Sequence, residues 1–242
     1  TNTTGGNIRF DNGTALDVTG VTQVAGANLD INNTGQVTIS GAVDDGGGGA
    51  ITQIDIDTGG AAGIVDGGGV LRADTINLQT TAASSGAIGA SGNRIETAGT
   101  TSLSMGQGTS LADAFINHTG GALTIAGVSG SGTSTIDIVA SGTIDDTGAI
   151  VGQTLSTSSD GGTTLDVGHT VDSFSATNTT GGNIRFDNGT ALDVTGVTQV
   201  AGANLDINNT GQVTISGEVD DGAGNNPITQ IDIDTGGAAG IV

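Results

Sequence analysis

Residues Thr1 to Gly41 read TNTTGGNIRFDNGTALDVTGVTQVAGANLDINNTGQVTISG, and the same letters return unchanged at Thr177 to Gly217, a period of 176 residues. Self-similarity at a fixed period is the sequence signature of a repeat protein. We therefore read 1–242 as one continuous repetitive segment. One long repeat occupies 1–176, and 177–242 is the start of the next.

The two copies differ in length at a single place. The first has GGGGA at 46–50 and the second has GAGNNP at 222–227, after which ITQIDIDTGGAAGIV resumes identically from Ile51 and from Ile228. A length change confined to Gly, Asn, Ala and Pro is typical of a surface loop. The second copy stops at Val242, the match of Val65, and we expect the natural chain to continue with something close to DGGGVLRADT.

A shorter rhythm runs inside the long repeat. Apolar alternations such as NIRF, ALDV, NLDI and QVTI begin at Ile8, Leu16, Leu29 and Val37, in steps of 8 and then 13 residues. An apolar residue at every second position indicates a strand with one buried face. The intervening TGG, DNG and NNTG stretches suit tight turns, because Gly, Asn and Asp tolerate a positive φ.

Such short strands cannot bury their apolar face alone, but stacked coils can bond to one another above and below. The sequence therefore predicts an all-β parallel solenoid with about 21–22 residues per coil, eight coils per long repeat and about eleven coils in the chain. The competing fold, a string of β-sandwich modules, usually buries a Trp or Tyr, and the chain has neither. No stretch shows a helical period, so helices are not expected.

Composition points to a slim core and an acidic surface. The chain has 46 Gly, no Cys, Trp or Tyr, and four Phe, so many small aliphatic contacts must replace bulky aromatic ones. Its formal net charge is −21, with four Arg and no Lys. Nucleic acid and anionic bilayers are poor partners for such a surface. No apolar run approaches the roughly 18 residues that would span a bilayer, so membrane insertion is not expected.

Two longer phrases carry a resemblance to a known family. RADTINLQTTAASSGAIGASGNRIETAGTTSLS at Arg72 to Ser104 and FINHTGGALTIAGVSGSGTSTIDIVASGTI at Phe115 to Ile144 resemble the repeats of filamentous haemagglutinin-like exoproteins and giant autotransported adhesins. The resemblance is one of rhythm and composition over nearly the whole chain. It implies a right-handed β-helix exported to the bacterial cell surface, with a role in attachment, biofilm or a surface filament.

The function expected from these features is structural: an extracellular stalk, filament or adhesin segment with no catalytic residue and no cofactor. The alternative class is a carbohydrate-active enzyme, a polysaccharide lyase or hydrolase, because parallel β-helices often carry such activities. Asp55 and Asp57, and their repeats Asp232 and Asp234, should point outward where coils could pair them. Sugar sites usually want aromatic platforms, however, and the chain has no Trp or Tyr.

Calcium is a weaker hypothesis. No nonapeptide calcium repeat and no EF-hand loop is present, and a solvated acidic face is tolerable without metal, since two carboxylates one coil apart repel by only ~0.9 kcal/mol in water. A calcium-stabilised adhesin module remains an alternative. The weak candidates lie in pairs at turns: Asp44, Asp45, Asp145, Asp146, Asp220 and Asp221.

The remaining polar residues are assigned places in the coil. His118 and His169 match no nucleophile or zinc pattern, so turn or surface positions are expected for both. Five asparagines that begin N-x-[ST] triplets should lie in turns and stack along the axis: Asn12, Asn32, Asn117, Asn188 and Asn208. Arg9 and Arg185 should face solvent.

The partners expected are the chain itself or neighbouring repeats, through end-to-end stacking into a filament, because the ends of a solenoid present unpaired backbone. Host or cell-surface glycans or proteins are further candidates.

Overall fold

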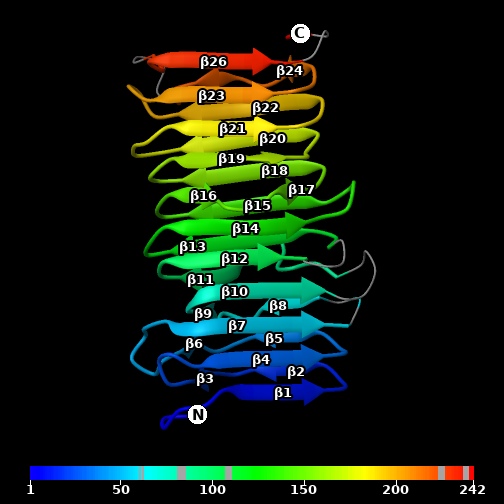
Figure 1. Cartoon of the computed structure of the whole chain (residues 1–242), viewed down its shortest axis with the longest axis vertical. Coiled ribbons are helices and arrows are strands. Elements are labelled where there is room, and N and C mark those ends of the chain that lie inside the picture. The colour runs from blue at the N-terminus through cyan, green and yellow to red at the C-terminus, as the bar shows by residue number, and fades with distance from the viewer. Residues whose placement is uncertain (60, 62, 81–85, 107–110, 223–226, 237–239) are drawn as a thin grey trace.

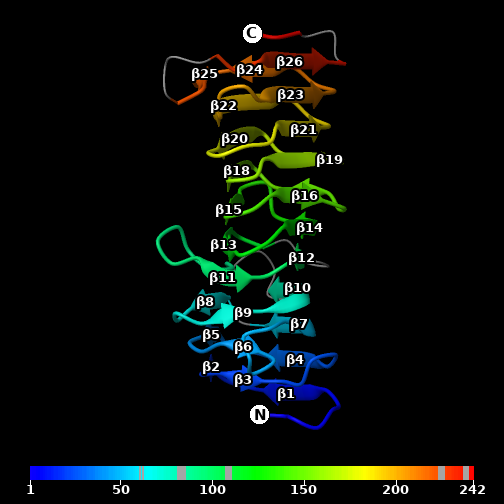
Figure 2. The ribbon, with the colours of Figure 1, turned by 90° about the vertical axis from the view of Figure 1, so that its left-hand side faces the viewer.

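The structure is a computed structural model, and in it the chain forms a right-handed parallel β-solenoid. The structure describes residues 1–59, 61, 63–80, 86–106, 111–222, 227–236 and 240–242, and these contain strands and turns but no helix. In Figure 1 the front strands run from left to right and the rear strands return while the chain climbs, which makes the coil right-handed. The termini lie at opposite ends of the rod (Figure 2).

Within the described residues, three parallel sheets form the walls of the rod, with the strands given below. The long sheet has 12 strands: β1 (Ile8–Asn12), β4 (Asn28–Asn33), β7 (Ile51–Thr58), β10 (Ala73–Thr80), β12 (Thr101–Met105), β14 (Leu123–Ser129), β16 (Ile144–Asp146), β17 (Ile150–Val151), β19 (Thr163–His169), β21 (Ile184–Asn188), β23 (Asn204–Asn209) and β26 (Gln230–Thr235).

The opposite sheet has 11 strands: β3 (Val21–Thr22), β6 (Val43–Asp44), β9 (Val70–Leu71), β11 (Ile95–Ala98), β13 (Ala114–Thr119), β15 (Thr135–Ala140), β18 (Thr154–Ser159), β20 (Ser173–Asn178), β22 (Leu192–Gln199), β24 (Val213–Ile215) and β25 (Val219–Asp220). The short sheet has three: β2 (Leu16–Val18), β5 (Val37–Ile39) and β8 (Ile64–Asp66).

The coil length found agrees with the predicted one. Ten steps lead from β1 to β26 along the long sheet, which gives about ten turns of roughly 21 residues, close to the eleven coils expected. Individual turns vary, from 19 residues between Ile144 and Thr163 to 27 between Ile76 and Leu103. Eight of these turns separate Ile8 from Ile184, so the 176-residue period is a whole number of coils.

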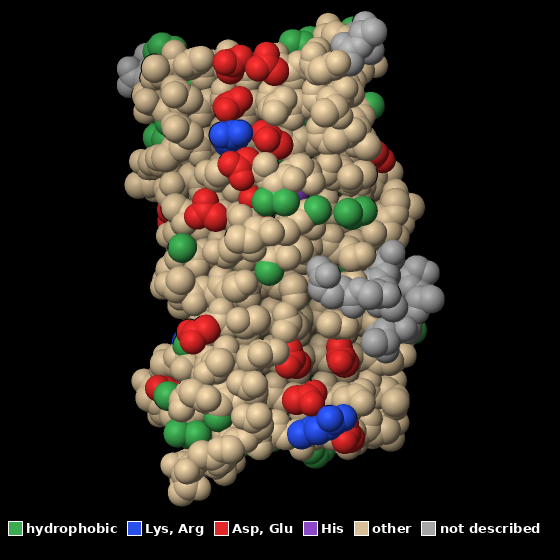
Figure 3. Space-filling model, viewed as in Figure 1, with side chains coloured by type: hydrophobic (Ala, Val, Ile, Leu, Met, Phe, Trp, Pro, Cys, Tyr) green, Lys and Arg blue, Asp and Glu red, His purple; other side chains and the backbone are tan. Residues whose placement is uncertain are grey.

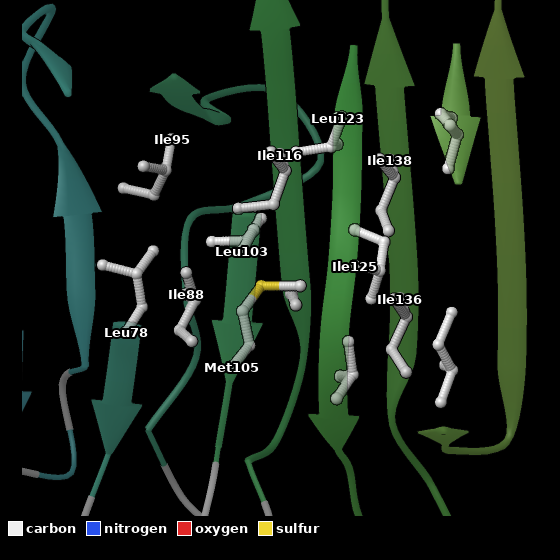
Figure 4. Packing of buried hydrophobic residues seen from close by; sticks show 14 of the residues in the cluster. Leu78, Ile88, Ile95, Leu103, Met105, Ile116, Leu123, Ile125, Ile136 and Ile138 are labelled. Carbon is white, nitrogen blue, oxygen red and sulfur yellow. The ribbon is translucent and has the colours of Figure 1, made fainter. Parts of the chain in front are cut away.

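Apolar side chains from the facing sheets fill the interior. Ile54 and Ile56 alternate with outward Asp55 and Asp57 along β7, and both isoleucines are fully buried. Figure 4 shows Leu103, Met105 and Ile125 of the long sheet pointing toward the side chains of the opposite sheet. Burying one such aliphatic side chain contributes about 1.5 to 3 kcal/mol. Because each coil adds only a few of them, stability has to be built up by stacking coils.

Close stacking leaves no room for side chains at some turns. A Cβ placed on Gly41 would lie 2.0 Å from the Thr19 carbonyl oxygen, and one on Gly217 would lie 1.8 Å from that of Thr195. These are the same position in the two copies of the long repeat. Glycine is needed there because the backbone of the preceding coil occupies the space of a side chain.

The glycine-rich stretch that differs between the copies is a surface loop in the first copy. Gly46 to Gly48 are exposed, and the backbone N–H of Asp45 donates to the Gly49 carbonyl across the loop. In the second copy, 223–226 of the predicted loop at 222–227 lie outside the described residues. Within the parts of the chain that the structure describes, no helix is long and apolar enough to cross a bilayer.

Candidate functional site

Outward side chains of the long sheet form rows that run along the axis of the rod. Parallel register places Arg9, Asp30, Asp55 and Asn77 one above another on successive strands. Arg9 lies 3.4 Å from Asp11 and 3.7 Å from Asp30, and Asn77 donates from Nδ2 to Asp55 Oδ1. Red carboxylates and blue arginines gather in such groups on the face in Figure 3.

The second copy repeats this arrangement with a coil on each side. Arg185 lies 3.9 Å from Asp166 below, 3.9 Å from Asp206 above and 3.7 Å from Asp187 on its own strand. Arg9 and Arg185 face solvent, as predicted, with 66% and 46% of their side chains exposed. Ion pairs this exposed add little to stability, because water and salt screen the charges and ordering two long side chains costs entropy.

Asp55 and Asp57 also point outward as predicted. Partial burial raises the pKa of Asp57, and the nearby charges of Asp55 and then Asp30 raise it further. Gln53 donates from Nε2 to both oxygens of Asp55 at 2.9 and 2.8 Å. A carboxyl with a raised pKa beside a second carboxyl is the kind of pair that glycosidases use for acid–base chemistry. This pair is the part of the rod that a carbohydrate-active enzyme would use.

Two of the calcium candidates bond to a loop of their own chain. One oxygen of Asp45 accepts hydrogen bonds from the backbone N–H groups of Gly47 and Gly49, both at 2.8 Å, and these bonds lower the pKa of the carboxyl. Asp44 accepts from the Gly46 N–H at 2.8 Å and lies 3.9 Å from Arg72. Both carboxylates thus already hold the loop.

The other candidates are placed differently from one another. Asp146 has a nearly fully buried side chain, whereas Asp145 beside it points outward on β16 near the Thr143 hydroxyl. Asp220 accepts from the Gly222 N–H at 3.0 Å, and Asp221 directly follows β25. Among the residues that the structure describes, no three His, Asp or Glu side chains are grouped so that they could hold a metal ion.

Asp146 belongs to a buried polar cluster with His169, which sequence reasoning missed. The expectation that His169 is a turn or surface residue is wrong, since its side chain is fully buried on β19. His169 Nε2 lies 3.0 Å from Asp146 Oδ2, off the line that a good hydrogen bond prefers, and Nδ1 accepts the Ile150 N–H at 2.9 Å. Burial lowers the pKa of His169, and the charge of Asp146 offsets this only in part.

This cluster supports an irregular strand. The two oxygens of Asp146 accept the backbone N–H groups of Asp166 and Val167, both at 3.2 Å, where the register of β19 shifts before His169. On the core side, His169 stacks on Phe186 with ring centroids 5.4 Å apart, and Phe186 stacks on Phe174 at 4.1 Å. The buried polar cluster therefore has a structural role: Asp146 binds the irregular part of β19, and His169 packs against the aromatic side chains of the core.

His118 is likewise buried and not at a turn or on the surface. It lies on β13 with its Nδ1 2.9 Å from the Thr97 hydroxyl, and burial lowers its pKa. Both histidines occupy inward positions near strand ends, where polar side chains stack from coil to coil. In one such ladder, Asn188 donates to Asn209 at 3.0 Å, and in the first copy Asn12 donates to Asn33 at 2.8 Å. Axial stacking of Asn12 and Asn188 is confirmed, although each is the last residue of a strand and not part of a turn. The prediction of turn positions is also wrong for Asn32, Asn117 and Asn208, which lie inside strands, where Asn117 donates to Glu96 of the neighbouring coil.

No protein-family model, curated protein or solved structure matches this chain. The two copies of the long repeat can be compared with each other instead. Identical residues of the two copies, called twins here, occur both inside the stack and in its first or last coil, so their exposed fractions can be compared directly. Phe186 is fully buried between coils, whereas its twin Phe10 in the first coil is 45% exposed. At the other end, Ile54 is fully buried and its twin Ile231 is 51% exposed.

The first and last described coils are therefore less covered than their counterparts inside the stack. At the N-terminal end, a hollow of about 200 Å³ is lined by the apolar residues of the first two coils, Ile8, Phe10, Leu16, Val18, Val21, Leu29 and Ile31. At the C-terminal end, Ile241 is 50% and Val242 is 66% exposed. Among the described strands, β1 and β26 each pair on one side only.

Proposed function

We propose that this chain is a segment of a structural stalk, filament or adhesin at an extracellular bacterial surface. In this role the stacked coils supply length and stiffness, and the acidic exterior keeps the polymer soluble. Any receptor, such as a cell-surface glycan or protein, would meet a repeated face of the rod. The resemblance to filamentous haemagglutinin-like exoproteins agrees with this proposal.

One observation carries the proposal: duplication of the 176-residue block preserves the stack. The block holds eight turns, so the second copy begins at the same place on the same wall, with Ile184 paired with Leu205 just as Ile8 is paired with Leu29. A duplication that was not a whole number of coils would turn apolar faces outward. Copying a block adds length without new chemistry, which suits a spacer, whereas catalysis needs a single assembled site.

The test is the length of the particle. A variant with one further copy of 1–176 inserted in register should lengthen by roughly 40 Å, which is eight coils at about 4.8 Å. Small-angle scattering and electron microscopy of the two proteins measure this increment. As a control, an inserted block short by half a coil should disrupt the stack and lower the cooperativity of unfolding. Compact particles whose length does not grow with the inserted block would reject the rod.

A carbohydrate-active enzyme remains the second candidate because of the raised pKa of Asp57 beside Asp55. We expect no turnover when the chain is incubated with neutral and acidic polysaccharides and reducing ends are counted. Turnover that disappears in Asp57→Asn, with the fold retained, would favour the enzyme instead. The matched variant Asp234→Asn changes the same position in the exposed last coil and serves as the control.

A further inference from the structure

We infer that Asn32 and Asn208 are attachment sites for N-linked glycans, one on the long sheet in each copy of the long repeat. Both residues begin an Asn-x-Thr triplet, which is the acceptor sequence for N-glycosylation in secreted proteins. The inference rests on the proposed extracellular role, because exported chains are the ones that carry such glycans. Its support comes from the exposure and the hydrogen bonds of the triplets.

Seven asparagines of the chain begin an N-x-[ST] triplet, and the fold makes them unequal. They are Asn2, Asn12, Asn32, Asn117, Asn178, Asn188 and Asn208. The structure describes all seven, and only Asn32 and Asn208 are exposed. A sugar needs open space at the side-chain nitrogen, so exposure reduces the seven triplets to two.

Two of the other triplets begin with a buried asparagine whose side-chain nitrogen is already used. Asn178 is 1% exposed, and its Nδ2 donates to Gln199 Oε1 at 2.8 Å. Asn188 is 3% exposed, and its Nδ2 donates to Asn209 Oδ1 at 3.0 Å. A glycan on either nitrogen would have to fit inside the rod and would break the polar ladder.

The remaining three asparagines are half-buried and also bonded. Asn117 Nδ2 donates to both carboxylate oxygens of Glu96, at 2.9 and 2.7 Å. Asn2 and Asn12 each donate from Nδ2 to carbonyl groups a few residues further along the chain. These nitrogens serve the fold, so a sugar on any of them would displace an existing bond.

Strand geometry presents the whole triplet at the two exposed sites. Alternate residues of an extended chain point to the same face, and Asn32 and Thr34 are both exposed while the residue between them is buried. Asn208 and Thr210 repeat this arrangement. Neither exposed asparagine side chain bonds to any residue that the structure describes. An enzyme therefore meets the carboxamide and the hydroxyl group side by side on an accessible surface.

The exposure of these two asparagines does not depend on where the stack begins or ends. Strand β4, with Asn32, lies between β1 and β7, and strand β23, with Asn208, lies between β21 and β26. Each asparagine is in register with an aspartate of the coil below and an aspartate of the coil above. Glycans would project from this acidic face at two points eight coils apart, which is roughly 40 Å at about 4.8 Å per coil.

The reaction joins the side-chain nitrogen to a sugar that is activated as a diphosphate. A bond forms between Nδ2 and the anomeric carbon, and the bond from that carbon to the diphosphate oxygen breaks. The diphosphate leaves with the electron pair, one carboxamide proton passes to solvent, and nothing is oxidised or reduced. A separate transferase supplies the catalysis, with either a nucleoside diphosphate sugar or a lipid diphosphate oligosaccharide as donor.

The first experiment incubates the full folded chain with a soluble N-glycosyltransferase and UDP-glucose, and intact-mass spectrometry counts the sugars. We expect two per chain. The other asparagines should react at least about tenfold more slowly, because local opening must come first. No transfer to the folded chain, or equally fast transfer to all seven asparagines, would overturn the inference.

Variants are needed to assign the sites, because the peptides around Asn32 and Asn208 are identical in sequence. Asn32→Gln and Asn208→Gln should each leave one sugar, and the double variant should leave none. Asn117→Gln is the matched control and should still carry two. Two sugars on the double variant would place the modification elsewhere and contradict the assignment.

The second experiment maps the glycans on the protein recovered from the cells that produce it. A modified peptide containing Asn32 or Asn208 supports the inference. A single sugar there indicates a nucleoside diphosphate donor, and a preassembled oligosaccharide indicates a lipid diphosphate donor. If that peptide is unmodified but the protein scatters as an elongated particle, the glycan sites are wrong and the structural role stands. A compact particle would reject the rod itself, whether or not the peptide carries sugar.

Discussion

At the scale of single residues, the two histidines show most clearly how the surroundings of a side chain change its pKa. His118 and His169 are enclosed by coils on both sides, and burial lowers the pKa of each. His169 also uses Nδ1 to accept the Ile150 N–H, which a protonated ring cannot do at that atom. Folding therefore favours the neutral form of both imidazoles.

This predicts that the rod loses stability as pH falls below about 6.5, the ordinary histidine pKa. The unfolded chain takes up protons there while the folded chain does not, so the free energy of unfolding decreases by up to about 1.4 kcal/mol per pH unit for each histidine. Urea unfolding followed by far-ultraviolet circular dichroism between pH 8 and pH 5 measures the slope. His118→Gln should reduce it; an unchanged slope would mean that His118 titrates equally in both states.

At the scale of structural elements, the repeat shows that a strand depends on the strand beneath it. Leu192–Gln199 forms the single strand β22 over β20, whereas the identical residues near the N-terminal end form β2 and β3 with a break between them. The polar ladders follow the same rule. The Asn188 side chain is buried and bonds both to Asn209 above and to Val171, while the Asn12 side chain donates to Asn33 and Thr14.

The matched pair Asn188→Ala and Asn12→Ala tests the ladder. Asn188→Ala leaves the Val171 N–H and Asn209 Oδ1 without a partner inside the stack, so it should cost about 2 to 3 kcal/mol. Asn12→Ala removes the same side chain at a solvated end and should cost less than about 1 kcal/mol. Chemical unfolding of the two variants measures both values. Equal losses would show that stacking inside the rod adds nothing to the ladder.

At the scale of the whole molecule, the formal net charge of −21 opposes folding along a narrow rod. Charges spread over the outer faces repel through water, and salt screens them within about 10 Å at 0.1 M. The rod should therefore melt at a higher temperature as sodium chloride is added. This response belongs to the total charge and not to any one carboxylate.

Comparing calcium with magnesium distinguishes an effect of the total charge on the melting temperature from calcium binding at a specific site. At matched ionic strength, calcium should raise the melting temperature no more than magnesium, because Asp44, Asp45 and Asp146 already accept backbone N–H groups. A larger calcium shift would instead indicate binding at a turn, as RT ln(1 + [L]/Kd) requires. In that case Asp145→Asn or Asp221→Asn should remove the shift.

The solenoid, its coil length and the outward acidic rows were predictable from the sequence. Alternation along a strand has a period of two, so Ile54 and Ile56 determine that Asp55 and Asp57 point outward, and the 176-residue period determines how many coils repeat. These properties depend only on which residues are neighbours in the chain. Local pattern is enough to set them.

The burial of the two histidines and the shared role of Asp146 were decided only by the tertiary structure. His169 looks like a turn residue in sequence because its strand is bulged, and its burial depends on Phe186 and Ile150, which belong to other strands. The same holds for Phe10 and Phe186, which have identical local sequence but opposite exposure. Burial in a solenoid is a property of the coil above and the coil below, and a residue's own sequence neighbours cannot specify either.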